Sequence, residues 1–399
     1  MKDRTLPLVL AAAGIFALTM GIRQSQALFI GPFNSHTGIG IASISLAFAF
    51  AQLMWGVTQP IAGVFADRYG PGRVLAVGAL AVALGTALTP YANSAIALIV
   101  LIGVISAGGA GAAGPSVLMA AIAKLIPPEK RGFATGFVNA GGSFGQFAIA
   151  PISQALIGGI GWMAALGTLG FMMLAALPLA FVLRGRPAHG AAAGTGQTLR
   201  SAVQVALRDP SFLLLSGGFF VCGFHVAFIA VHMPGVIALC GLAPEVGAWS
   251  LAIIGLFNIA GSFGIGWAVG RWRMKSLLSL IYAARALAVL AFLVAPKTEL
   301  TFLVFSAVLG VTYLSTVPPT AGLVAKFYGP QYMATLFGLV MLSHQVGGFL
   351  GAWLGGKTFE ATNSYDLMWY ADIALALAAA MIHLPIREKA VPRALAAAA

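Results

Sequence analysis

The sequence predicts an all-α membrane protein with twelve transmembrane helices arranged as two pseudo-symmetric six-helix bundles. Three observations support this fold class: the composition, the number of long apolar runs, and a repeat that relates the two halves of the chain. Of the 399 residues 60% are apolar and only 8% are charged, whereas an ordinary soluble domain carries about 25% charged residues. This composition excludes a soluble globular protein and a disordered chain.

The apolar runs are each long enough to cross a bilayer, which takes roughly 20 residues per helix. Twelve spans are expected, near residues 6–31, 42–65, 73–92, 95–123, 132–157, 162–183, 211–236, 246–269, 276–295, 300–323, 332–355 and 367–385. A polar, low-complexity stretch between the sixth and seventh spans indicates a flexible linker. We therefore expect an N-terminal bundle at residues 1–183, a cytoplasmic linker at 184–210 and a C-terminal bundle at 211–399.

The basic residues orient the chain in the membrane. All but four of the 22 Lys and Arg residues fall in loops on one side. Lys297 and Lys357 lie on the other side, and Arg23 and Arg285 lie inside apolar runs. By the positive-inside rule the crowded side is cytoplasmic, so both termini are expected there, with a bacterial inner membrane as the location. The charges do not cluster on one water-facing surface, which argues against a nucleic-acid partner.

The two halves of the chain repeat each other at an offset of 202 or 203 residues. The matched pairs are Gly21 with Gly223, Arg23 with His225, Pro32 with Pro234, Gly63 with Gly266, Arg68 with Arg271, Pro115 with Pro318, Gly136 with Gly338, and Gly145 with Gly347. Parallel six-helix repeats are an arrangement of secondary transporters, whose substrate site lies between the halves near the bilayer midplane.

Arg23 lies inside the first apolar run and is the leading candidate for a functional charge. A charge inside a span costs at least about 2.5 kcal/mol on insertion scales, so it normally faces a cavity or a partner. In the alternative interpretation the first helix ends near Ile22 and Arg23 reaches outward into water. Residues 27–33 remain almost entirely apolar, which favours the cavity. Because a guanidinium can bind a carboxylate through two parallel hydrogen bonds, we expect an anionic ligand.

Histidines are candidates for a second substrate contact or a proton site. His225 occupies the repeat position of Arg23, and an unperturbed histidine titrates near neutral pH, so it can couple a proton to a bound anion. The alternative is that His225 is a packing residue. His232 and His344 are rival candidates, and His344 has polar neighbours on both sides.

Asn139, Ser143 and Gln146 form one stripe of the expected fifth helix because they recur at i, i+4 and i+7. Asn258 and Ser262 form a shorter stripe on the eighth. Such residues either line a polar cavity or hydrogen-bond between helices, and both interpretations stay open.

Three further polar residues fall inside expected spans. Tyr313, deep in the tenth span, either donates its hydroxyl to a carboxylate or packs against neighbouring helices. Arg285 and Asp372 lie in the ninth and twelfth spans, at depths that place them too far apart to pair. We expect both charges to act as structural anchors.

A charged turn follows the second span, with the sequence Gly63-Val-Phe-Ala-Asp67-Arg68-Tyr-Gly70-Pro-Gly72-Arg73. It closely resembles the signature loop of the major facilitator superfamily, and the likeness to that superfamily extends over nearly the whole chain. The resemblance implies that these charges hold the cytoplasmic side closed. The repeat of this loop in the second half has glycine in place of the aspartate, so a latch there is weaker or uses other partners. The residues assigned to gating are Gly63, Asp67, Arg68, Arg73 and Arg271.

Two further stretches narrow the resemblance. Residues 21–29 with Pro32, and residues 128–136 leading into Gly141 and Gly142, look like the first and fifth helices of the monocarboxylate and oxalate/formate transporter branch. In that branch, basic residues of the eighth or eleventh helix commonly hold the carboxylate. This sequence has no Lys or Arg inside either helix, a departure that leaves the substrate open.

These observations together predict a secondary active transporter that moves a small organic anion by alternating access. A monocarboxylate is the first candidate, moved with a proton or in exchange for another anion. The candidate substrate-binding residues are Arg23, His225, Asn139, Ser143, Tyr313 and His344. The expected partners are the anion, the proton and the lipid bilayer, with no cofactor, metal or nucleic acid, and the chain is expected to work as a monomer.

Two other classes of function were weighed against this prediction. A drug-type exporter of the same fold usually needs an intramembrane carboxylate for cationic substrates, and Asp372 is the one that the sequence offers. An enzyme needs a catalytic constellation, but the sequence shows no metal-spaced His/Glu helix and no nucleophile motif. The glycine-rich run at residues 108–114 is not a nucleotide loop, because no strand precedes it and no lysine follows.

Overall fold

The computed structural model describes residues 5–184, 199–329 and 333–390, apart from the side chains of a few helix residues that include Asp67. The N-terminal half contains α1 (Thr5–Ser25), η1 (Gln26–Phe29), α2 (Ile30–Thr37), α3 (Ile41–Tyr69), α4 (Pro71–Leu88), η2 (Thr89–Tyr91), α5 (Ala95–Leu98), η3 (Ile99–Ser106), α6 (Ala107–Ala112), α7 (Pro115–Leu125), α8 (Pro128–Ile160), α9 (Trp162–Met173) and α10 (Ala176–Val182). The C-terminal half contains α11 (Leu199–Arg208), α12 (Pro210–Leu239), α13 (Pro244–Val269), α14 (Met274–Val294), α15 (Glu299–Thr312), α16 (Val317–Tyr328), α17 (Met333–Thr362) and α18 (Asp366–His383).

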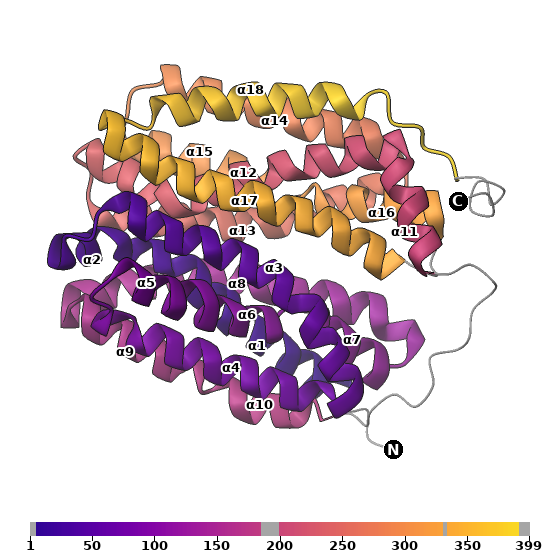
Figure 1. Ribbon diagram of the computed structural model, residues 1–399, viewed down its shortest axis with the longest axis horizontal. Coiled ribbons are helices and arrows are strands. Elements are labelled where there is room, and N and C mark those ends of the chain that lie inside the picture. The colour runs from indigo at the N-terminus through magenta and orange to yellow at the C-terminus, as the bar shows by residue number, and fades with distance from the viewer. Residues whose placement is uncertain (1–4, 185–198, 330–332, 391–399) are drawn as a thin grey trace.

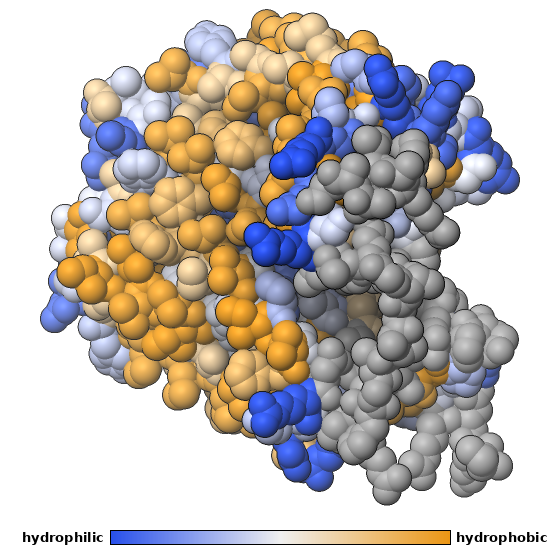
Figure 2. Space-filling model, turned by 45° about the vertical axis from the view of Figure 1, so that its right-hand side comes forward, coloured by the Kyte–Doolittle hydropathy of each residue, from blue (hydrophilic) through white to orange (hydrophobic). Residues whose placement is uncertain are grey.

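Within the described residues eleven helical segments are long and apolar enough to cross a membrane. The twelfth span, predicted at residues 132–157, falls within α8, a 33-residue helix that is not among the eleven because glycine and polar residues dilute its apolar content. On the face shown in Figure 2, apolar side chains cover the middle of the molecule and hydrophilic side chains gather toward its two ends. The all-helical membrane fold predicted from the sequence is confirmed.

The helices form two groups that lie one above the other. In Figure 1 the indigo-to-magenta helices of the N-terminal half lie below the rose-to-yellow helices of the C-terminal half. Two long helix pairs join the halves, α3 with α17 and α8 with α13. The domain boundaries themselves stay a prediction, because residues 185–198 lie outside the described part of the chain.

The predicted flexible linker contains a regular helix. Residues 199–208 form α11, which ends where Asp209 caps the start of α12 by accepting a hydrogen bond from the Ser211 amide at 2.9 Å. The prediction of a flexible segment is therefore wrong for these ten residues. Apolar and polar residues alternate at helical spacing in this stretch, and that periodicity outweighs the low-complexity composition before it.

Close helix contacts confirm the internal repeat. In the N-terminal half a Cβ at Gly145 of α8 would clash with the Ala17 carbonyl of α1. At the matching place in the C-terminal half, a Cβ at Gly347 of α17 would clash with the Phe220 carbonyl of α12. Glycine allows the two backbones to approach at both sites, as small residues do in membrane helix pairs. The repeat is thus a repeat of helix contacts.

The fourth and tenth spans are both interrupted, and at matching positions. In the fourth span α6 ends at Ala112 and α7 begins at Pro115, and in the tenth span α15 ends at Thr312 and α16 begins at Val317. Proline near the start of each second segment ends the hydrogen-bond ladder of the segment before it. In transporters of this architecture broken helices face the ligand site, since irregular backbone inside a membrane must line a cavity or be buried in protein.

The two halves make contact in the middle and at one end, and diverge at the other. We call the end that carries Arg68, Arg73, Arg271, Lys275 and Lys326 the basic end, and the opposite end the far end. At the far end Gly40 packs against Glu360, and Gly356 packs against Ser45.

Toward the basic end the four helices that join the halves, α3, α8, α13 and α17, carry glycines with open space around them. A Cβ built at Gly63 on α3, Gly136 on α8, Gly266 on α13 or Gly338 on α17 would meet no described heavy atom within 4 Å. In Figure 2 the surface is hollowed between the halves on the side where the basic residues lie. The halves are therefore in contact at the far end and separated by a hollow at the basic end.

Candidate functional site

Arg23 lies close to the centre of the first membrane span. The span runs from Thr5 to Thr37 as α1, η1 and α2 without leaving the helical conformation. The helix therefore does not end near Ile22, and the alternative in which Arg23 reaches outward from a helix end is excluded. The guanidinium sits where α1 passes into the tighter 3₁₀ turn of η1 and is half-buried.

The contacts of the Arg23 guanidinium are all with uncharged groups. One terminal nitrogen donates to Gln52 Oε1 at 2.5 Å, and the other donates to Gln24 Oε1 at 3.3 Å. The guanidinium carbon lies 4.7 Å from the centre of the Trp55 ring, a cation–π arrangement. The Nε atom is buried and has no hydrogen-bond partner. Among the described residues no acidic side chain forms an ion pair with Arg23, so none of them compensates its charge.

A narrow pocket beside Arg23 is built from both halves. The N-terminal half contributes residues of α1, η1 and α3, and the C-terminal half contributes α12. The lining residues are Arg23, Gln24, Gln26, Ala27, Phe48, Ala51, Gln52, Ala230 and Val231. A ligand bound here contacts both halves at once, which is the geometry that lets binding energy act on their relative motion.

Gln345 on α17 is fully buried, and neither its Nε2 nor its Oε1 atom has a hydrogen-bond partner in the described structure. The side chain packs directly over Gly56 of α3, next to Trp55. The indole Nε1 of Trp55 is also buried and unpartnered. A buried unpaired polar group costs about 1–3 kcal/mol. The Trp55 ring faces Arg23, and Gln345 packs at Gly56, one helical turn along α3 from Gln52, so both unpartnered groups lie next to residues that contact the arginine.

The predicted polar stripe of the fifth helix ties the two halves together. Asn258 Nδ2 on α13 donates to Ser143 Oγ on α8 at 2.9 Å, and Gln146 Nε2 on α8 donates to the Leu251 carbonyl on α13 at 3.0 Å. Asn139, one turn nearer the basic end, is exposed. The structure thus supports interhelical hydrogen bonding for Ser143 and Gln146 and leaves Asn139 free for other contacts.

Tyr313 lies at the break of the tenth span and connects the site to the interior of the C-terminal half. Its hydroxyl is 3.5 Å from Gln24 Nε2 and donates to the Val226 carbonyl at 3.4 Å. Asn258 Oδ1 accepts the Leu314 amide at 3.1 Å within the same break. Gln24 of the N-terminal half thus contacts the Tyr313 side chain, and Asn258 of the C-terminal half contacts the interrupted backbone.

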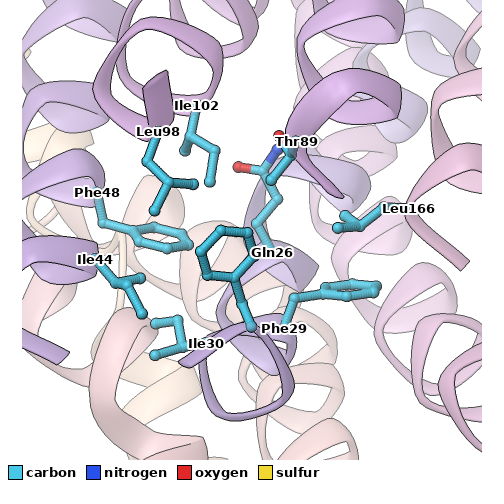
Figure 3. Close-up of a pocket in the computed structure, with 10 residues that line it drawn as sticks. Gln26, Phe29, Ile30, Ile44, Phe48, Thr89, Leu98, Ile102 and Leu166 are labelled. Atoms are coloured by element: carbon cyan, nitrogen blue, oxygen red, sulfur yellow. The ribbon is translucent and has the colours of Figure 1, made fainter. Parts of the chain in front are cut away.

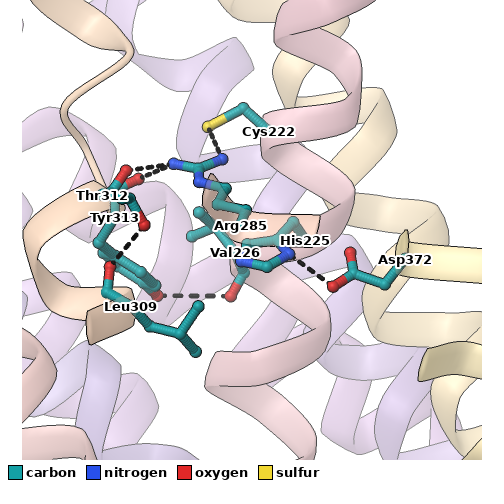
Figure 4. A network of polar contacts seen from close by, with 8 residues as sticks. All are labelled: Cys222, His225, Val226, Arg285, Leu309, Thr312, Tyr313 and Asp372. Carbon is teal, nitrogen blue, oxygen red and sulfur yellow. Dashed lines mark hydrogen bonds and ion pairs between the residues drawn. The ribbon is translucent and has the colours of Figure 1, made fainter. Parts of the chain in front are cut away.

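Arg285 on α14 caps the first half of this broken helix. It is fully buried and donates to the carbonyls of Thr312 and Tyr313 at 2.5 and 2.7 Å and to Cys222 Sγ at 3.3 Å (Figure 4). The last carbonyls of a helix have no partner inside the helix, and a cationic side chain can donate hydrogen bonds to them. The predicted anchoring role of Arg285 fits these contacts.

The structure places His225 away from Arg23. His225 Nδ1 lies 2.6 Å from Asp372 Oδ2 on α18, and the two side chains are 1% and 0% exposed (Figure 4). The pair is enclosed in the C-terminal half and does not line the Arg23 pocket. Because Asp372 pairs with a histidine inside the bundle, it is not available as the free intramembrane carboxylate that a drug-type exporter would use.

The other two histidine candidates have separate surroundings. His344 on α17 is buried, its ring lies 4.8 Å from the Phe219 ring, and its Nδ1 has no partner. His232 Nε2 bonds to the Ala352 carbonyl at 2.8 Å. Neither residue lines the Arg23 pocket.

The gating residues lie at the open basic end. Arg68 and Arg73 are exposed, and the Arg68 guanidinium lies 5.4 Å from the Tyr69 ring. Arg271 stacks on the Trp267 ring at 4.0 Å and donates to the Trp267 carbonyl at 3.2 Å. The side chain of Asp67 lies outside the described part of the chain. Their role in gating stays a prediction.

At the basic end of the C-terminal half, two acidic residues that the sequence interpretation missed form hydrogen bonds and an ion pair. Glu388 accepts the Lys275 amide at 2.6 Å and lies 3.3 Å from Lys326 Nζ, and Asp209 accepts the Tyr328 hydroxyl at 2.9 Å. These contacts stay within that half. The C-terminal repeat of the charged turn has glycine in place of aspartate, and the acidic residues near that end, Glu388 and Asp209, come from other parts of the chain.

A second pocket lies within the N-terminal half and is lined mostly by apolar side chains (Figure 3). Its polar lining residues are Gln26 and Thr89. Gln26 Nε2 bonds to Ser106 Oγ at 3.2 Å and to Thr86 Oγ1 at 3.4 Å, so it is already satisfied. The pocket carries no charge and contains none of the predicted substrate residues.

The sequence interpretation missed Gln24 and Gln52, which line the pocket beside Arg23, and Trp55, whose ring faces the guanidinium. A signal for them was present, because Gln24 follows Arg23 directly and Gln52 is a polar residue in the middle of the second apolar run. Gln345 stood beside His344 in a polar stretch of the eleventh run. Side-chain direction decides which of these neighbours reaches the pocket, and sequence spacing did not supply it.

Two six-helix halves with broken helices and a half-buried site between them define a secondary transporter of the alternating-access class. Residues 9–394 match the Major Facilitator Superfamily, and the chain belongs to this family. It is a multi-pass integral membrane protein and a transporter rather than an enzyme. The resemblance noted in the sequence is confirmed.

The chain is similar to several characterised and uncharacterised transporters. It is 25% identical over 391 residues to the uncharacterised MFS-type transporter YcxA of Bacillus subtilis, covering 96% of this chain and 95% of the relative. It is 25% identical over 373 residues to the oxalate:formate antiporter of Oxalobacter formigenes, covering 91% and 86%. It is 24% identical over 391 residues to monocarboxylate transporter 13 of Rattus norvegicus, covering 94% and 88%.

Solved structures confirm the fold. A D-xylose–proton symporter superposes with a TM-score of 0.73 at 16% identity, covering 97% of this chain and 98% of that one. A bacterial homologue of the human lysosomal transporter spinster, in an inward-facing and occupied conformation, superposes with a TM-score of 0.72 at 14% identity, covering 100% and 96%.

Proposed function

We propose that this chain moves a small organic anion, a monocarboxylate being the first candidate, together with a proton. The observation that carries the proposal is the Arg23 guanidinium, which sits between the halves and whose partners in the described part of the chain are Gln24, Gln52 and the Trp55 ring. A cation at this depth needs a compensating charge, and a bound carboxylate supplies one through two parallel hydrogen bonds. The relatives named as monocarboxylate and oxalate:formate transporters support an anionic substrate.

The basic end is proposed to be cytoplasmic, with both termini on that side of the inner membrane of a bacterium. Exposed basic residues gather at this end, whereas Lys297 and Lys357 lie at the far end. The structure then corresponds to an inward-open state. In the proposed cycle an anion enters from outside, binds Arg23 between the halves, and leaves when the basic end opens. Closing of that end is assigned to the loop from Gly63 to Arg73.

The working unit is proposed to be a single chain. The support for this is that both halves of the chain supply walls to the Arg23 pocket.

Uptake into proteoliposomes tests the proposal. The probes are radiolabelled formate, acetate, L-lactate, pyruvate and oxalate, each offered at an external pH below and equal to the internal pH. The wild type is expected to accumulate at least one of them, faster under the acid gradient. Arg23→Gln is expected to lower kcat/KM by about 30-fold or more, because removing one member of a close charge pair costs at least 2 kcal/mol.

Lys297→Gln is the matched control, since it also removes one half-buried positive charge but does so at the far end. It is expected to transport at the wild-type rate. Unchanged flux in Arg23→Gln, or no uptake of any anion by the wild type, contradicts the proposal.

A second candidate function is exchange of two anions, favoured by the relative that is named an oxalate:formate antiporter. Vesicles preloaded with one unlabelled anion distinguish the two. Exchange alone requires the internal anion for any uptake, whereas symport with a proton also proceeds into empty vesicles.

A further inference from the structure

A buried ionisable pair lies in the C-terminal half, outside the Arg23 pocket. His225 in the middle of α12 and Asp372 in the second turn of α18 approach to 2.6 Å and have almost no contact with solvent (Figure 4). Ionisable side chains inside a membrane are costly, so a protein keeps them for a purpose. Packing of α12 against α18 alone would be served as well by apolar residues of the same volume.

The pair is incompletely satisfied. His225 Nε2 and Asp372 Oδ1 are buried, and neither has a hydrogen-bond partner in the described structure. A pair that only fixed the register of two helices is expected to have both partners fully hydrogen-bonded. Each unpartnered atom is instead a place where a proton can be added or removed without breaking another contact.

Arg285 on α14 is a further buried charge in this half, and its field reaches Asp372. Its hydrogen bonds go to Cys222 Sγ and to the carbonyls of Thr312 and Tyr313, and among the described residues it forms no ion pair with Asp372. The other titratable groups buried on the surrounding elements are Cys222 and His232 on α12, Tyr282 on α14, Tyr313 at the break after α15, His344 on α17, Tyr365 before α18 and His383 on α18. None of these residues has a carboxylate, so Asp372 is the one buried carboxylate among the described residues of these elements.

A short chain of contacts joins the pair to the anion pocket. Gln24, which accepts from Arg23, also lies 3.5 Å from the Tyr313 hydroxyl. That hydroxyl donates to the carbonyl of Val226, the residue after His225. Arg285 holds the Tyr313 backbone from the other side. A change of charge at Arg23 therefore acts on the pair through one layer of polar groups.

We propose that the His225–Asp372 pair is the proton-binding site that couples a proton to the anion bound at Arg23. This inference rests on the proposed function. One proton from the outer water adds to the pair when an anion binds, and it leaves to the cytoplasm when the anion leaves. No other bond forms or breaks.

Charge balance explains why proton and anion move together. The empty carrier, with a neutral imidazole, buries the positive charges of Arg23 and Arg285 and the negative charge of Asp372. An anion alone lowers this net charge by one, and a proton alone raises it by one, whereas both together restore it. The proton and the anion together therefore cross without net charge, whereas an anion alone carries one negative charge inward against an inside-negative membrane potential. A proton alone adds a further uncompensated positive charge to the low-dielectric interior.

The test separates coupling from transport. Asp372→Asn and the double variant His225→Gln/Asp372→Asn are reconstituted with the anion probe that the wild type accumulates best. Two activities are measured: counterflow of labelled against unlabelled probe at equal pH, and uphill accumulation driven by an acid exterior. We expect counterflow to stay within about threefold of the wild type while accumulation ratios fall at least tenfold to near one.

His232→Gln is the matched control, because it removes another buried histidine of the same helix whose partner is a backbone carbonyl. It is expected to keep full accumulation. Full accumulation by the double variant overturns the inference, and so does loss of counterflow in a variant that elutes as a folded, monodisperse protein. If Asp372→Asn does not fold, the double variant, which leaves no unpaired carboxylate or imidazole, gives the same decision. Absence of any anion flux in the wild type instead rejects the proposed function itself.

Discussion

The guanidinium of Arg285 donates to the carbonyl of Tyr313 at 2.7 Å, at the point where the tenth membrane span is interrupted. The same guanidinium also holds the Thr312 carbonyl, so one cation satisfies the end of α15. Irregular backbone in a membrane requires such partners, because no water is present to replace them. The charge in the ninth span thus stabilises the interruption of the tenth span by binding its free carbonyls.

The first prediction concerns this cap. Arg285→Met leaves two buried carbonyls without partners, each worth about 1–3 kcal/mol, so we expect a loss of about 3 kcal/mol in stability. Thermal unfolding of the purified protein in detergent, at one scan rate, measures it as a lowered Tm. Lys297→Met is the control: Lys297 also donates to carbonyls, those of Phe292, Leu293 and Ala295, but it is partly exposed at the far end, where water can replace it, so its Tm is expected to fall less. Equal Tm values for the two variants would contradict the capping role.

Much of the fold follows from the sequence because lipid leaves few choices. An apolar run of about 20 residues in a bilayer must be a helix, so counting such runs predicted the helices. The repeat of Gly145 at Gly347 predicted equivalent close contacts, since only glycine lets the backbones of two helices touch there. The end of the linker was the exception, where a ten-residue helix follows a low-complexity stretch.

The partner of His225 could not be predicted in the same way. α12 is apolar on nearly every side, so its sequence carries no periodicity that fixes which face a given residue presents. Repeat symmetry predicted that His225 lies at the depth of Arg23, in the middle of a membrane span, and His225 does lie in the middle of α12. The direction of the side chain was set by Asp372, a residue 147 positions away. For the same reason Gln345 was recognised as polar but not as a neighbour of Trp55.

The second prediction concerns Gln345. If its unpartnered amide completes the anion site, Gln345→Met removes one hydrogen bond to a charged ligand, which is worth about 1.5–3 kcal/mol. We expect the KM for the best anion probe to rise by about 10-fold or more with little change in stability. Titration of tryptophan fluorescence, to which Trp55 contributes, gives an independent Kd.

Gln59→Met provides the control for Gln345. Gln59 is also a buried glutamine at a helix interface, but its Oε1 already accepts from Ser116 Oγ at 2.8 Å. This variant is expected to keep the KM of the wild type. A KM for Gln345→Met within twofold of the wild-type value would remove Gln345 from the site.

The third prediction concerns closure of the far end. Glu360 on α17 accepts the Ala42 amide at 2.8 Å, so its carboxylate sits at the N-terminus of α3 in the other half. A negative charge there is worth about 0.3–1 kcal/mol. Glu360→Gln is therefore expected to raise the population open at the far end by about two- to fivefold.

Spin labels report that population directly. Asn93→Cys and Ala243→Cys place one label on each half at the far end, in a Cys240→Ser background, and double electron–electron resonance measures their distance distribution. Glu299→Gln is the control, because Glu299 lies in the first turn of α15 and its charge acts within one half. A distribution for Glu360→Gln that matches the wild type would show that the contact does not hold the far end closed.

The fourth prediction tests the orientation of the chain. Cys240 ends α12 at the far end and is partly exposed, whereas Cys222 is buried in the middle of the helix. Burial raises the pKa of the Cys240 thiol, and the nearby Lys297 offsets part of the rise. The thiolate is the reactive form, so a raised pKa means slow reaction at pH 7 and a rate that grows about tenfold per pH unit until the pKa is reached.

A charged maleimide that cannot cross the membrane is added to intact spheroplasts at pH 7 and pH 9. If the far end faces outward, Cys240 is labelled from outside, at least tenfold faster at pH 9, and Cys240→Ser is not labelled at either pH. The loss of labelling in Cys240→Ser identifies the thiol, and the sidedness identifies the membrane face on which it lies. Labelling that appears only after the membrane is permeabilised would place the far end in the cytoplasm, and the direction assigned to the transport cycle would then be reversed.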